Sequence, residues 1–77
     1  QGNQLNLTGW QEGAQAVPAI KAIRHHSALG LGAAKQIIDE CLGGKGVLIT
    51  AINPATAARL QAALAELGFT TQHLFSG

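Results

Sequence analysis

The stretch VPAIKAIRHHSALGLGAAKQIID, residues 17–39, decides the fold because it contains two helical patterns with a break between them. Apolar residues at Val17, Ile20 and Ile23 recur three apart and predict a first helix over 16–26. The segment SALGLG then interrupts this period. A chain that stops one helix and starts another within a few residues is expected to form a helical hairpin.

The second helix of this hairpin follows the break and ends at two glycines. Its apolar positions are Ala34, Ile37, Ile38, Cys41 and Leu42. This spacing predicts a helix over 31–42, and the pair Gly43-Gly44 is a typical C-terminal stop. We expect Gly30, in the break, to adopt a left-handed turn conformation.

Three strand-like segments flank these helices. NQLNLTGW, residues 3–10, alternates apolar and polar residues, which predicts a short half-buried strand ended by Gly9. GVLITAI, 46–52, is rich in β-branched and aliphatic residues and is interpreted as a strand buried on much of both faces. TTQHLF, 70–75, predicts the last strand.

A third helix is predicted between the last two strands. Asn53 suits the N-cap and Pro54 the first helical position, while Gly68 ends the helix. Its leucines repeat at Leu60, Leu64 and Leu67. The order β-α-α-β-α-β predicts an α+β fold for residues 1–77 as a single domain: a three-stranded antiparallel sheet covered on one face by three helices.

Composition limits the class of protein. The 77 residues are 47% hydrophobic and 12% charged, which favours one small folded domain over a disordered segment. No apolar run approaches the roughly 20 residues of a membrane span, so no membrane association is expected. The single cysteine permits no internal disulfide and suits a reducing, cytoplasmic setting. Because the chain begins at Gln1 without a methionine, we expect a fragment of a longer protein.

Positive charge is concentrated in the predicted hairpin. Three of the five basic residues, Lys21, Arg24 and Lys35, lie between Glu12 and Asp39, where no acid occurs. Lys21 and Arg24 are three apart on the first helix, so a basic face beside the turn is expected. Ordinary solubilising charge explains this pattern as well on composition alone. A face that binds an acidic protein and one that binds nucleic acid both remain open.

The glycines and histidines near the turn do not fit a nucleotide or metal site. A dinucleotide fingerprint needs a strand before its glycines, whereas a helix precedes Gly30. Adjacent helical residues point about 100° apart, so His25 and His26 are not expected to hold one metal ion together. We predict no metal, no cofactor and two surface histidines.

A catalytic thiol is also not expected. Cys41 could pair with His73 or His26, but it lies on the predicted core stripe, where a free cysteine is usually an apolar filler. Asp39 and Glu40 show no pairing typical of acid–base catalysis and are expected to be solvated. The sequence therefore predicts no catalytic residue.

The hairpin resembles the C-terminal domain of the bacterial ribosomal stalk protein, large-subunit protein seven/twelve. The matching segments are Ile20-Lys21-Ala22-Ile23-Arg24, Leu29-Gly30-Leu31, Ala34-Lys35 and Ile37-Ile38. The β-α-α-β-α-β order matches that domain as well. In the family, this hairpin recruits translational GTPases through lysines and an arginine that face an acidic surface.

The resemblance implies a non-enzymatic domain that binds a protein partner, such as a translation elongation factor. The partner-binding residues implied by the resemblance are Val17, Ile20, Lys21, Arg24, Leu29, Gly30, Leu31 and Lys35. We add His25, which follows Arg24 on the same predicted surface, as a residue expected to set the specificity of this chain.

This chain departs from the family pattern within the same hairpin. His25 stands where the family usually has glycine, and Gly32 and Ala33 replace a charged pair. The chain is also more sparsely charged than family members. A divergent accessory or phage-type adaptor with another protein partner therefore remains an alternative. The Clp protease-adaptor family resembles the same fold and is an example of such an adaptor. A weak nucleic-acid-binding module is a separate alternative.

Overall fold

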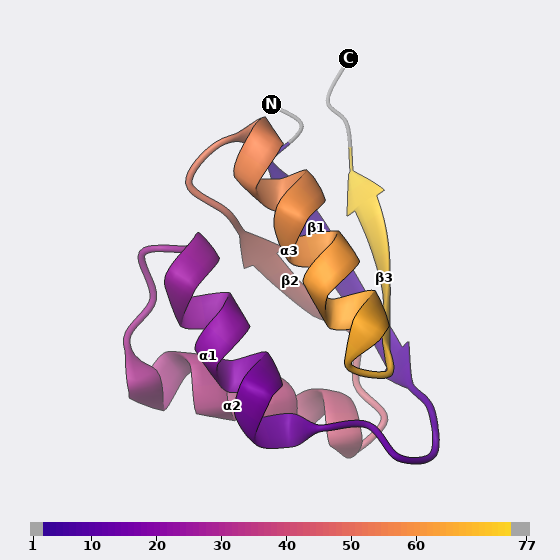
Figure 1. Cartoon of the computed structure of the whole chain (residues 1–77). Coiled ribbons are helices and arrows are strands. Elements are labelled where there is room, and N and C mark those ends of the chain that lie inside the picture. The colour runs from indigo at the N-terminus through magenta and orange to yellow at the C-terminus, as the bar shows by residue number, and fades with distance from the viewer. Residues whose placement is uncertain (1–2, 75–77) are drawn as a thin grey trace.

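The computed structural model describes the backbone of residues 3–74 and the side chains of residues 3–72. Its elements are β1 (Gln4–Trp10), α1 (Ala16–His26), α2 (Leu31–Leu42), β2 (Val47–Thr50), α3 (Pro54–Glu66) and β3 (Phe69–Leu74) (Figure 1). The predicted α+β fold and its β-α-α-β-α-β order are confirmed. The first two helices have the predicted bounds, 16–26 and 31–42.

The first strand is the centre of the sheet. β1 pairs antiparallel with β2 on one side and with β3 on the other, giving the order β2-β1-β3. Alternation along β1 turns Leu5 and Leu7 to the covered face, where both are fully buried. The prediction that Gly9 ends this strand is wrong: the register shifts between Leu7 and Gly9, and the strand continues through this irregularity to Trp10.

The three helices form one layer over the sheet. α3 packs on β1 and β3, α2 packs on β1 and β2, and α1 packs on the other two helices (Figure 1). Each helix contributes its apolar stripe to one core, which holds Ala19 and Ile23 from α1, Ala34, Ile37, Ile38 and Cys41 from α2, and Ala57, Leu60 and Leu64 from α3. The hydrophobic periodicity of the sequence therefore corresponds to real burial.

The second strand differs from its prediction. It spans Val47–Thr50 rather than 46–52, and it is not buried on both faces. Ile49 is fully buried, whereas Leu48 points away from the core and is 51% exposed. The physical reason is position: β2 lies at the edge of the sheet and helices cover one face only.

The helix ends follow local chemistry with one exception. The Asn53 side chain accepts a hydrogen bond from the Thr56 amide at 2.8 Å and caps α3, as predicted. Gly44 and Gly68 have φ of +93° just beyond α2 and α3, which glycine adopts readily. The exception is Gly30, which is not left-handed. Its φ of −81° and ψ of 179° are extended backbone, and it serves as the N-cap of α2.

None of the helices in the described part of the chain has the length and apolar character needed to cross a bilayer. The longest of them, α3, has 13 residues.

Two glycines with the same φ provide a matched test of packing. A Cβ built on Gly68 lies 2.9 Å from the Ala14 Cα, whereas one built on Gly44 meets nothing within 4 Å. Gly44→Ala is expected to lower the free energy of unfolding by about 1 kcal/mol, the cost of a left-handed alanine. Gly68→Ala should cost roughly 1–3 kcal/mol more because backbone must shift. Urea unfolding followed by Trp10 fluorescence measures both, and equal losses would contradict the close approach to Ala14.

Candidate functional site

The candidate site is the outer surface of the α1–α2 hairpin. On α1, Val17, Lys21 and Arg24 are exposed and spaced i, i+4 and i+7, so they share one face of the helix. Val17 is 63% exposed, which is high for an apolar side chain. Ile20 is half-buried, packs against the core and flanks this face. The surface thus combines two cations with an apolar side chain.

The connection between the helices is fixed by Ser27. Its side chain is buried, and its hydroxyl donates to the Ile23 carbonyl at 2.5 Å and accepts from the Leu29 amide at 3.3 Å. Next to it, the Ile52 amide donates to the His26 carbonyl at 3.2 Å. Leu29 packs half-buried against the core, while Gly30 is exposed. The turn is therefore held to the body of the protein at defined points.

The α2 part of the surface contains one apolar and one basic residue. Leu31 is 56% exposed at the first position of the helix, and Lys35 is exposed one turn later. The Lys35 ammonium lies 2.8 Å from the carboxylate of Asp39, four residues further on. The hydrogen bond that the Lys35 ammonium donates to Asp39, followed by the negative charge of that carboxylate, raises the pKa of Lys35 above its usual value. Lys35 stays protonated, and its positive charge is already partly balanced by the carboxylate of Asp39.

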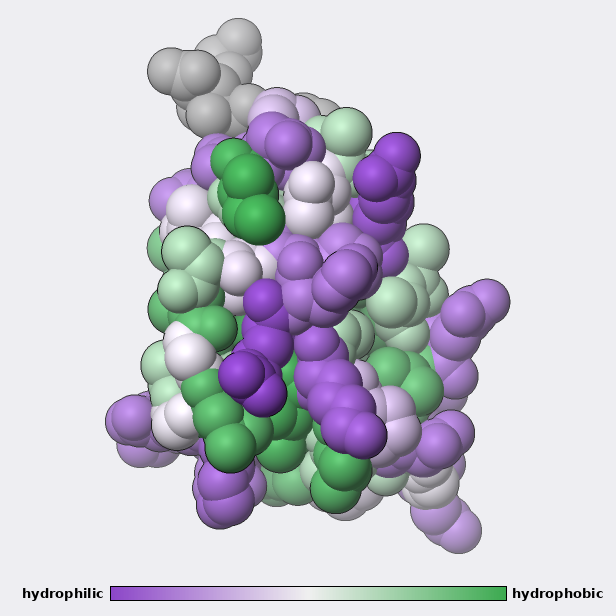
Figure 2. Space-filling view, turned by 60° about the vertical axis from the view of Figure 1, so that its left-hand side comes forward, coloured by the Kyte–Doolittle hydropathy of each residue, from purple (hydrophilic) through white to green (hydrophobic). Residues whose placement is uncertain are grey.

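Lys21 and Arg24 differ from Lys35 in this respect. Among the side chains of residues 3–72, the pair Lys35–Asp39 is the one ion pair, so neither cation of α1 forms an ion pair with an acid of this part of the chain. Figure 2, turned so that the hairpin side comes forward, shows hydrophilic side chains running between hydrophobic ones on this face. Uncompensated charge beside exposed apolar surface is an arrangement suited to binding an oppositely charged surface.

The two histidines lie at the end of α1. Their ring centroids are 4.9 Å apart with the planes nearly perpendicular. The Nδ1 of His26 is 2.8 Å from the Ala22 carbonyl, while His25 is exposed. In the described residues no three His, Cys, Asp or Glu side chains are grouped closely enough to hold a metal ion. His25 therefore belongs to the hairpin surface rather than to a metal-binding cluster.

Cys41 lies in the core, as predicted. Its side chain is buried, and its Sγ contacts the Gly9 carbonyl at 3.6 Å. Burial raises the pKa of this thiol because the thiolate is poorly solvated there. The side chain of His73, one candidate base, lies outside the described residues. The polar contact of Cys41 that the structure describes is to backbone and not to His26.

No protein-family model, no curated protein and no solved structure matches this chain.

The contacts of two hairpin residues, Asp39 and Ser27, were not predicted from the sequence. Asp39 was expected to be a solvated acid; it is exposed, but it binds Lys35, and the i, i+4 spacing was a visible signal for that pair. The sequence places Ser27 in the break between two helices. Its two hydrogen bonds are typical of serine near helix ends, but its bridge to Ala51, just beyond β2, joins residues distant in the sequence and had no sequence signal.

The state of Cys41 can be tested by thiol labelling. A raised pKa means a smaller thiolate fraction at any given pH, and burial also blocks access, so both effects slow the reaction. With DTNB at pH 8, we expect the folded chain to react at least about tenfold more slowly than the urea-unfolded chain. Cys41 is the sole cysteine of the sequence, so the signal is unambiguous. Equal rates in both states would show that the thiol is accessible and activated.

Proposed function

We propose that this chain is a non-enzymatic, cytoplasmic protein-interaction domain whose α1–α2 hairpin binds an acidic surface of a protein partner. The observation that carries the proposal is that Lys21 and Arg24 share an exposed helix face and form no ion pair among the described side chains. Val17 and Leu31 add exposed apolar contact area on the same hairpin. The cations would steer encounter and set specificity, and the apolar residues would exclude water.

The class of partner follows from the resemblance to the ribosomal stalk domain. Lys21, Arg24 and Lys35 occupy positions that in that family face the acidic surface of a translational GTPase. A bacterial elongation factor is therefore the first partner to test. His25, Gly32 and Ala33 depart from the family motif on this surface, so a different acidic partner, as for a divergent adaptor, is the variant of the same proposal.

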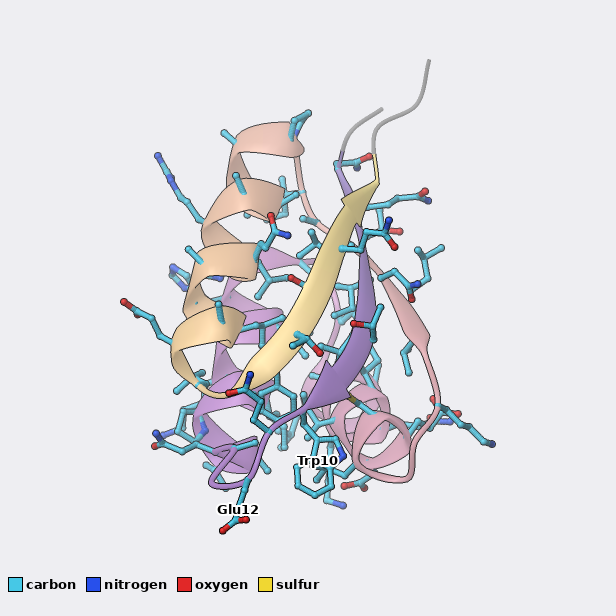
Figure 3. All side chains as sticks on the ribbon, turned by 90° about the vertical axis from the view of Figure 1, so that its right-hand side faces the viewer. Trp10 and Glu12 are labelled. Carbon is cyan, nitrogen blue, oxygen red and sulfur yellow. The ribbon has the colours of Figure 1, made fainter. Side chains whose placement is uncertain are left out.

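A protein partner is favoured over nucleic acid by the composition of the hairpin. Residues 16–42 contain no Phe, Tyr or Trp on which bases could stack. The aromatic residue nearest in sequence, Trp10, ends β1 and is followed by Glu12 in the connection to α1 (Figure 3). Two unpaired cations without a stacking platform suit a protein surface better than a polyanionic strand.

The hairpin cations are tested by a pair of double variants with equal charge change. Lys21→Ala with Arg24→Ala removes two positive charges from α1, and Lys45→Ala with Arg59→Ala removes two from outside the hairpin. Binding to a purified bacterial elongation factor is measured by calorimetry in 50 and 300 mM salt. We expect roughly a tenfold or larger loss of affinity for the α1 variant, a small change for the control, and weaker binding in high salt.

Circular dichroism verifies that both variants keep their fold. Equal losses in the two variants would reduce the effect to net charge and refute the hairpin surface. If the unmodified chain binds no elongation factor, the partner class is wrong. A gel shift at low salt with single- and double-stranded DNA then tests the nucleic-acid alternative.

A further inference from the structure

The ion pair of α2 bears directly on the proposed binding surface. The Lys35 Nζ and the Asp39 Oδ2 are 2.8 Å apart, and their side chains are 63% and 58% exposed. An exposed i, i+4 pair is weak and screened by salt, so a stronger competitor can exchange with it. The contact is therefore formed in the free protein but can be reversed.

Asp39 also lies on the same face of α2 as the apolar residue at the start of that helix. Leu31, Lys35 and Asp39 are spaced four residues apart, which places them in one row along the helix. Glu40 is the next residue, about 100° further round the helix. It forms no ion pair among the side chains of residues 3–72. Of the two acids of α2, only Asp39 both forms an ion pair with a cation and lies in this row.

We propose that Asp39 is a specificity-determining residue that acts as an internal competitor for the acidic partner. This inference rests on the proposed function of the hairpin. Asp39 supplies Lys35 with the carboxylate that a partner would otherwise provide, and its own charge repels further acids from α2. The acidic groups of the partner are thereby directed to α1, over Lys21 and Arg24, while α2 contributes apolar contact through Leu31.

Two variants with the same charge change separate this effect from net charge. Asp39→Asn releases Lys35, whereas Glu40→Gln leaves the pair intact, and each removes one negative charge. Two probes are used at 50 mM salt: poly-L-aspartate and the purified bacterial elongation factor. We expect Asp39→Asn to tighten binding about threefold and Glu40→Gln to change it less than about 1.5-fold. Combining Asp39→Asn with Lys35→Ala should remove the gain, since the two residues act as one unit.

A readout without any partner accompanies the binding data. The Lys35 pKa, measured by NMR titration of the ammonium group, should fall in Asp39→Asn and stay unchanged in Glu40→Gln, because Asp39 is what raises it. The inference is overturned if both variants tighten binding equally, if the gain persists without Lys35, or if no variant binds either probe.

Failure of the proposed function gives a different pattern. In that case the elongation factor is indifferent to Lys21→Ala with Arg24→Ala, while poly-L-aspartate still distinguishes Asp39→Asn from Glu40→Gln.

Discussion

The fold depends on burying one face of the central strand. Leu5 and Leu7 of β1 are fully buried, and both neighbouring strands pair with β1 rather than with each other. β2 and β3 come much later in the chain than β1. The segments that connect the three strands therefore cross the same face of the sheet. Those segments are the three helices, whose apolar stripes cover the two leucines. The helices cover this face only, so side chains on the opposite face, such as Leu48, are exposed.

This arrangement explains why charge collects on the hairpin. α1 packs on the other two helices and buries Ala19 and Ile23 in the core. Its opposite side is left to solvent and carries Lys21 and Arg24. The core and the candidate site use opposite faces of the same helix. Substitutions in the outer row can therefore be made with little cost in stability.

Features set by neighbouring residues were predictable from the sequence, and features set by distant contacts were not. The Asn53 cap and the glycine stops at Gly44 and Gly68 depend on local chemistry, and they are where the sequence indicated. The exposure of Leu48 depends on β2 being an edge strand, which aliphatic composition does not encode. Glycine permits both signs of φ, so its presence at position 30 did not fix the backbone there.

The same distinction applies to the candidate site. Its basic and apolar positions could be predicted from their helical spacing in the sequence. That Lys35 has a carboxylate partner while Lys21 and Arg24 have none became clear only when the acids of the described chain were placed in space.

The turn at Ser27 also affects the free edge of the sheet. β2 contains no charged residue and no proline, two features that usually protect an edge strand from pairing with other molecules, and its protection comes from its length of only four residues and from what covers its end. Because Ser27 forms a bridge with Ala51 and His26 accepts the Ile52 amide, the hairpin closes one end of that edge and limits the growth of the sheet.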